Sequence, residues 1–150
     1  MPPDRLGSMK VLFVGDVVGG IGRRSLAALL PGLREEHAPD FVVVNGENAA
    51  GGVGITERTA EDIFKAGADA ITLGNHAYRH TNVYEYLDTE DRIVRPANYP
   101  RQSPGRGHTV VSNGDLRLAV VNLSGTVFVS AARSPFSEID AVLSDLRGKA

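Results

Sequence analysis

The chain has 150 residues, of which 42% are hydrophobic and 23% are charged, and its formal net charge is −2 with a pI near 6.1. This length and composition are typical of one folded domain and exclude a disordered chain. The charge balance argues against a protein that coats nucleic acid, because binding by counterion release needs a basic face. Cysteine is absent, which excludes disulfides, a thiolate zinc site and a cysteine nucleophile, so any metal must be held by oxygen and nitrogen.

The sequence contains no sign of membrane insertion or secretion. No apolar stretch approaches the roughly 18 residues of a membrane span, and the N-terminal stretch MPPDRLGSMK lacks the apolar core of a signal peptide. We therefore expect a cytoplasmic protein. Residues 1–8 are expected to form a disordered or extended tail, and residues 9–150 one domain.

The first half of the chain alternates between strand and helix patterns. Apolar residues at helical spacing predict a helix over 22–37, which Pro31 is expected to kink or split because proline lacks a backbone donor. Thr56 is the expected N-cap of a second helix, and Gly67 its end. A short helix is expected around 82–88. Short apolar runs predict three strands, at 11–15, 41–44 and 69–73.

After residue 92 the pattern changes and becomes extended and rich in proline. Asn113 and Gly114 form a two-residue hairpin signal. We therefore expect antiparallel structure in this half, followed by an amphipathic helix over 137–147. Strand patterns lie on both sides of the expected turn, at 108–112 and 116–122.

Polar residues follow each of the three predicted strands in the first half. Asp16, Glu47 and Asn75 are separated by intervals of about one βαβ unit. The carboxyl ends of parallel strands meet at one edge of a sheet, where open α/β folds bind their ligands, so we expect these residues to lie close together. Hard oxygen donors with an adjacent imidazole at His76 predict a divalent-metal site with an acid beside it.

Most of these residues also have a purely structural interpretation. Asp16 could cap backbone amides in a Gly-Asp turn, and Asn48 and Asn75 could close Asx-turns. Glu47 is harder to explain in this way, because a carboxylate directly after an apolar run is costly to bury unless it is paired or binds a cation. The imidazole of His76 titrates near neutral pH and could protonate a departing alkoxide.

Other charged residues give weaker signals. Arg23 and Arg24, in the first turn of the first predicted helix, could recognise a phosphate together with the helix N-terminus, or could be solvated surface residues. His37 ends a charged run and is expected at the surface. His80 and His108 have no ligand-like neighbours at suitable spacing.

The ordered phrases G-D at Gly15 and Asp16, G-E-N at 46–48 and G-N-H at 74–76 resemble the first three blocks of the calcineurin-like metallophosphoesterases. More narrowly, the chain is similar to the YmdB-like branch of that superfamily, in which G-E-N stands where most relatives have a G-D block. The resemblance extends from about Met9 to the C-terminus. Five phrases carry it in this order: GDVVG, NGENAAGG, GADAITLGNH, VRPANYP and VVNLSG.

This resemblance implies an α/β fold, a metallophosphoesterase-like two-sheet sandwich flanked by helices. It also implies a dinuclear metal-dependent phosphodiesterase acting on cyclic nucleotides or related phosphodiesters, with RNA as a further candidate substrate. Carried over residue by residue, Asp16 and Asn48 would bind the first metal and Glu47 would bridge the pair. Asn75 would bind the second metal, and His76 would be the proton donor. Iron or manganese would suit these ligands.

The chain departs from the family pattern in one respect. The family completes its metal site with histidines from two later blocks, an F-H-A-E-like and a T-H-T-H-like phrase, and the present sequence stops at Ala150 before either. The sandwich is therefore expected to be truncated, lacking its C-terminal strands. An apolar sheet face is then expected to be exposed unless a homo-oligomer covers it.

Three function classes stay open from the sequence. The first is the metal-dependent phosphodiesterase. The second is a non-catalytic module of the same fold that binds nucleotide or metal. The third is a dinucleotide-binding oxidoreductase, suggested by Gly20, Gly22 and Ser25, although a serine stands at the third glycine position and the loop begins several residues beyond the strand.

Overall fold

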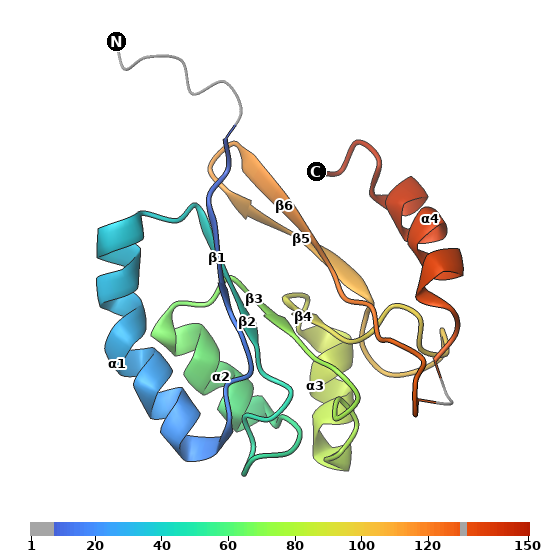
Figure 1. The fold of residues 1–150 in the computed structure, drawn as a ribbon, viewed down its shortest axis with the longest axis horizontal. Helices are drawn as coiled ribbons and strands as arrows, with labels where there is room; N and C mark the ends of the chain where they lie inside the picture. The colour runs from blue at the N-terminus through green and yellow to red at the C-terminus, as the bar shows by residue number, and fades with distance from the viewer. Residues whose placement is uncertain (1–7, 130–131) are drawn as a thin grey trace.

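The computed structural model describes residues 8–129 and 132–150, so the predicted tail, apart from Ser8, lies outside the described residues. A parallel sheet with strand order β1-β2-β3-β4 lies beside an antiparallel hairpin of β5 and β6 (Figure 1). The strands are β1 (Val11–Val14), β2 (Phe41–Asn45), β3 (Ala70–Thr72), β4 (Ile93–Val94), β5 (His108–Asn113) and β6 (Leu116–Val121). The helices are α1 (Gly19–His37), α2 (Glu57–Ala66), the 3-10 turn η1 (Thr81–Val83), α3 (Tyr84–Thr89) and α4 (Pro135–Leu146).

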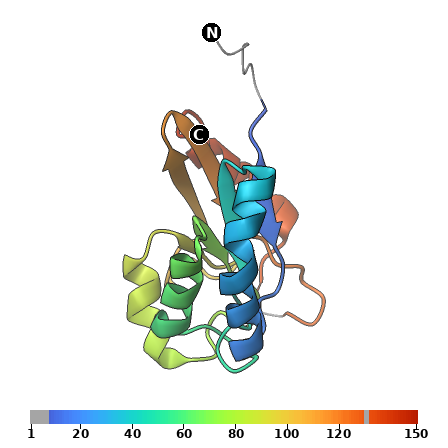
Figure 2. The same ribbon diagram turned by 90° about the vertical axis from the view of Figure 1, so that its left-hand side faces the viewer.

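The elements form layers around the parallel sheet. Figure 2 shows α1, α2 and α3 side by side over one face of this sheet, while the hairpin packs on the other. Alternation along β2 explains both contacts, because successive side chains of a strand point to opposite faces. Val42 and Val44 pack with the helices, whereas Phe41 and Val43 pack with Val120 of the hairpin. The uninterrupted apolar run of β2 is therefore buried on both sides.

The hairpin is also covered on both faces. Val111 and Val120 face the parallel sheet, while Ala119 and Val121 pack against Val142 of α4. The order of layers is thus helices, sheet, hairpin and helix. This arrangement confirms the predicted α/β fold with two sheets flanked by helices.

The helix that follows β2 has the ends predicted from the sequence. Thr56 accepts a hydrogen bond from the Thr59 amide, and the Thr59 side chain accepts one from the Thr56 amide, so the two residues form a capping box. Gly67 ends α2 in the left-handed conformation, with a φ of 117°. Residues at its own two ends therefore determine where α2 begins and ends between β2 and β3.

Of the two outcomes predicted for Pro31, a kink or a split, the split does not occur. The helix is continuous from Gly19 to His37. Both Pro31 and Ala27, whose carbonyl loses its backbone donor, are exposed. Water can therefore satisfy that carbonyl, and the helix continues.

Two predictions for the second half also need correction. Ile93–Val94 pairs in parallel with β3, so antiparallel structure begins only at β5. The hairpin turn lies one residue later than predicted, at Gly114 and Asp115, because Asn113 still pairs with Leu116. Gly114, with a φ of 58°, supplies the left-handed conformation that this turn requires.

The edge strand β1 is covered on one face only. Leu12 and Val14 pack with the helices, but Val11 and Phe13 are 42% and 59% exposed. The hairpin packs on β2, β3 and β4 rather than on β1. The expected exposed apolar face therefore includes this edge. No helix within the described ranges has the length and apolar character needed to cross a membrane.

Candidate active site

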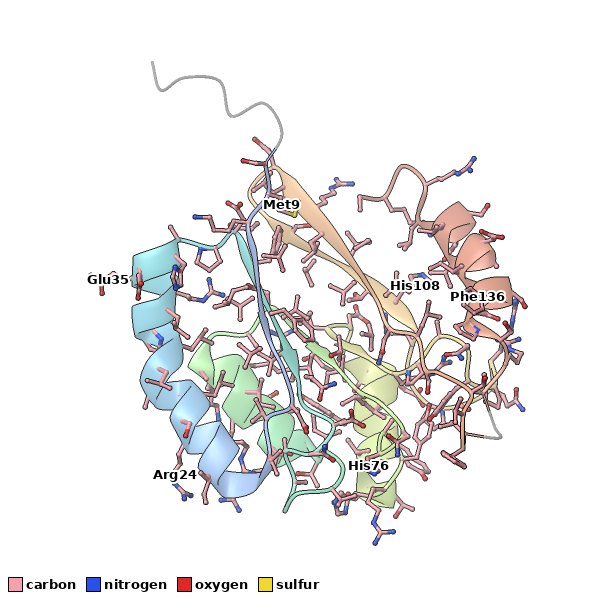
Figure 3. The ribbon with its side chains drawn as sticks, in the orientation of Figure 1. Met9, Arg24, Glu35, His76, His108 and Phe136 are labelled. Carbon is pink, nitrogen blue, oxygen red and sulfur yellow. The ribbon has the colours of Figure 1, made fainter. Side chains whose placement is uncertain are left out.

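Three polar side chains from different strand ends meet through one amide. Asp16 follows β1, Asn48 follows β2 and His76 follows β3. Asn48 Nδ2 donates to Asp16 Oδ1 at 2.7 Å, and Asn48 Oδ1 lies 2.7 Å from His76 Nδ1. Figure 3 places His76 at the end of the sheet remote from Met9, which is where the carboxyl ends of the strands lie.

Glu47 contributes a second carboxylate to this group. Its Oε2 lies 3.8 Å from His76 Nδ1, beyond hydrogen-bond distance. This oxygen is buried and has no hydrogen-bond partner among the described residues. Enclosing such an oxygen without a partner costs free energy, because it loses its bonds to water. The site therefore holds a carboxylate oxygen that a cation could satisfy.

Gly74 provides the space that this carboxylate occupies. A Cβ atom built at Gly74 would overlap both oxygens of Glu47. The Glu47 carboxylate can lie here because the first residue of the G-N-H phrase is glycine. The G-E-N and G-N-H phrases therefore pack directly against each other.

The loop after β1 is held against the loop after β2. Val17 donates its amide to the Asn45 carbonyl, and Gly19 donates its amide to the Asn48 carbonyl, both at 2.9 Å. Asp16, directly before Val17, has a φ of 31°, which is uncommon for a residue other than glycine. Such backbone conformations concentrate at functional sites.

Asn75 is the one predicted ligand that the structure does not join to the others. It precedes His76 and is exposed. Across 8–129 and 132–150, no hydrogen bond or ion pair connects its side chain to Asp16 or Glu47. Asn75 is therefore near the site only because it directly precedes His76 in the chain.

Among the remaining predicted residues, Arg23 has a structural contact. Its guanidinium lies 3.1 Å from Asp62 and also donates to the Ala49 carbonyl, so it braces α1 against α2. Arg24 is exposed on α1 (Figure 3). Both residues line a cavity of about 420 Å³ between α1 and α2, so a role in phosphate recognition stays a prediction.

The other histidines lie outside the site. His80 Nε2 is 2.9 Å from the Val53 carbonyl, and His108 Nε2 is 3.0 Å from Asp145. His37 is exposed beside Glu36. The described part of the chain contains no group of three or more histidine, cysteine, aspartate or glutamate side chains arranged to hold a metal. The polar cluster consists of two carboxylates, one amide and a single imidazole.

Two asparagines, to which the sequence patterns assigned no role, brace the strand ends. Asn122 donates to the carbonyl of Leu73, immediately before the G-N-H phrase, and to that of Val94 at 3.3 Å. Asn98, fully buried, donates to the carbonyl of Ser124 at 2.8 Å and accepts from its amide at 2.9 Å. Both lie in phrases that carry the family resemblance, VVNLSG and VRPANYP. Asn122 directly follows an apolar run, and this was the available sequence signal.

Tyr99 lies near the carboxylate of Glu47. Burial raises the pKa of Tyr99, a hydrogen bond with Ser124 lowers it, and the negative charge of Glu47 raises it further. The net shift is upward, so the phenol stays neutral near pH 7 and can donate a hydrogen bond.

The fold does not support the dinucleotide-binding alternative. Gly20 and Gly22 lie inside α1 rather than in a turn between strand and helix. In addition, β1 is at the edge of the sheet, whereas a doubly wound dinucleotide-binding sheet has its first strand in the middle.

Residues 12–150 match the family described as YmdB-like protein. The chain is 40% identical over 137 residues to the 2',3'-cyclic-nucleotide 2'-phosphodiesterase of Bacillus subtilis (strain 168). This match covers 91% of the present chain and 52% of the Bacillus protein.

Two crystal structures have the same fold. A hypothetical protein from Thermus thermophilus superposes with a TM-score of 0.84 at 39% identity, over 91% of this chain and 53% of that one. A novel phosphatase from Mycoplasma pneumoniae gives a TM-score of 0.84 at 28% identity, over 93% and 52%. Fold and comparisons thus define a relative of phosphodiesterases and phosphatases. The chain belongs to the YmdB-like family, as the sequence resemblance implied, and spans about half the length of the relatives it matches.

The packing of Gly74 against Glu47 predicts an asymmetric response to two glycine substitutions. Gly74→Ala should move the Glu47 carboxylate by about 1 Å or more, because a methyl carbon cannot approach a carboxylate oxygen closer than van der Waals contact. Gly15→Ala is the matched control, since nothing lies within 4 Å of its Cβ, and it should leave the carboxylate in place. Crystal structures of the two variants measure this displacement. An unmoved carboxylate in Gly74→Ala would contradict this packing.

Proposed function

We propose that this chain carries part of the active site of a metal-dependent phosphodiesterase that hydrolyses 2',3'-cyclic nucleotides or related phosphodiesters. The observation that carries the proposal is the buried Glu47 Oε2 without a hydrogen-bond partner among the described residues, beside the group of Asp16, Asn48 and His76. The activity of the Bacillus relative supports the substrate class.

The donor set fits two divalent cations. Asp16 and Asn48 would hold one ion, Asn75 would hold the other, and Glu47 would offer one oxygen to each. Hard oxygen donors favour iron or manganese over a thiolate-held zinc. Because two donors are neutral amides, the site would limit the negative charge that an incoming phosphodiester meets. When bound, such a pair of ions would supply charge neutralisation at the phosphoryl group and activation of the attacking water.

His76 would deliver a proton to the leaving oxygen. Asn48 donates through Nδ2 to Asp16, so its Oδ1 faces His76 Nδ1 as an acceptor. This contact places a proton on Nδ1 and fixes the orientation of the imidazole ring. The side chain is 38% exposed, so a substrate can approach it. A protonated imidazole in this place is suited to general acid catalysis.

A non-catalytic binding module is the second candidate. The observation that favours it is that the described cluster contains a single imidazole. Such a cluster offers few strong ligands to retain two metals. This alternative predicts binding of metal or nucleotide without hydrolysis.

Substitution of Glu47 tests the metal site directly. After incubation with Mn²⁺ and desalting, the chain should retain metal by elemental analysis, and Glu47→Gln should lose it because the variant lacks the bridging charge. Glu57→Gln, at an exposed position on α2, is the matched control and should behave like the parent. Equal metal content in the parent and Glu47→Gln would overturn the proposed site.

Hydrolysis of 2',3'-cyclic AMP then separates the two candidate functions. His76→Gln should retain metal but lower the rate by about 10²–10⁴-fold, the usual contribution of a general acid. A parent chain that holds metal and binds the nucleotide without turnover would instead support the binding module.

We further propose that a second copy of the chain covers the exposed face of β1. Val11 and Phe13 support this, because large apolar side chains side by side on an edge strand mark an interaction surface. Sedimentation equilibrium should show a dimer or larger assembly that Phe13→Asp dissociates. A monomer for the parent at micromolar concentration would contradict this proposal.

A further inference from the structure

Arg95, directly after β4, is a buried cation, with only 6% of its surface exposed. Its Nη1 donates to the Pro96 carbonyl at 2.9 Å, while Nε is enclosed and lacks a partner within the described ranges. None of the described carboxylates forms an ion pair with it. The hydroxyl oxygen of Tyr78 accepts a hydrogen bond from the Arg95 side chain, but burial raises the pKa of Tyr78, so this partner is neutral. A buried guanidinium without a counter-ion is costly.

Arg95 lines a cavity of about 260 Å³ between the segment that follows β4 and helix α4. Arg101 and His108 also line this cavity, and α4 contributes Glu138 and Asp145. Figure 3 shows His108 beside α4. Two guanidinium groups and one imidazole therefore converge on one cavity that is open to solvent.

The two carboxylates of α4 do not balance the buried guanidinium, because other cations already contact them. Glu138 lies 2.8 Å from Arg133, and Asp145 lies 3.0 Å from Lys149. The cavity therefore retains an uncompensated positive charge at its inner wall.

We propose that this cavity binds a phosphate group, either as inorganic phosphate or as a phosphomonoester, with Arg95 at its inner wall and Arg101 at its rim. The planar guanidinium fork suits phosphate oxygens, and a dianion can engage two such groups at once. The Arg101 side chain is 76% exposed, and its nearest contact with Glu138 is a long one of 4.0 Å. The guanidinium is therefore free to turn toward a ligand.

This second site is independent of the proposed phosphodiesterase site. His108, which lines the cavity, lies well apart from His76 at the strand ends (Figure 3). The cavity shares no lining residue with the group of Asp16, Glu47 and Asn48. Its ligand would therefore bind without metal and without turnover.

Phosphate titration of the metal-free chain tests the inference. At constant ionic strength, inorganic phosphate or AMP should raise the Tm in a saturable way, since a ligand that binds only the folded state stabilises it. Acetate and chloride at the same ionic strength should not. A response to AMP alone would assign the phosphomonoester form, and a response to both would assign the phosphate group itself. No saturable response to either, or an equal response to acetate, would overturn the proposal.

Arginine variants locate the site. Arg95→Met should weaken phosphate binding by about tenfold or more, since it removes hydrogen bonds from a charged donor. Because that position is buried, the variant can also unfold, so Arg101→Gln is the second variant and should weaken binding by about two- to fivefold. Arg58→Gln, at an exposed position on α2, is the matched control and should bind like the parent.

Proton NMR of the four histidines provides an independent readout. Phosphate should shift the ring signals of His108, assigned with His108→Gln, and leave those of His76 in place. Glu47→Gln should keep the phosphate response. A shift confined to His76, or a response lost in Glu47→Gln and kept in Arg101→Gln, would place the phosphate at the strand ends and refute the second site.

Discussion

The carboxylate of Glu47 is held against the end of β3 by the packing of the sheet, and the rest of the candidate site is arranged around it. One of its oxygens is enclosed without a partner among the described residues, and the absence of a side chain at Gly74 is what allows it to lie there. The Asn48 amide contacts Asp16 and His76 rather than this oxygen. A cation is the simplest group that would compensate this oxygen.

Much of the fold could be predicted because its signals are local. The FVVV run of β2 is apolar at every position because both faces are buried, and Thr56 with Gly67 encodes both ends of α2. Elements that depend on distant contacts could not be predicted. Ile93–Val94 is too short to show a period, and it becomes a strand because β3 pairs with it. Pro31 is tolerated because of solvent exposure, which the helical pattern does not reveal.

The candidate site was partly visible in the sequence for the same reason. Polar residues at the ends of parallel strands must lie at one edge of the sheet, so grouping Asp16, Glu47 and His76 required only the strand pattern. The supporting contacts were not visible. Asn122 reaches the end of β3 from the residue after β6, and Arg95 shares a cavity with α4, so both depend on the packing of segments far apart in the chain.

Anomalous diffraction from crystals of this chain soaked in Mn²⁺ tests the central claim most directly. The account predicts a manganese peak within bonding distance of Glu47 Oε2, with Asp16 and Asn48 as further ligands. Crystals that show no peak at Glu47, or that bind manganese only elsewhere, would contradict the interpretation of this carboxylate as a metal ligand.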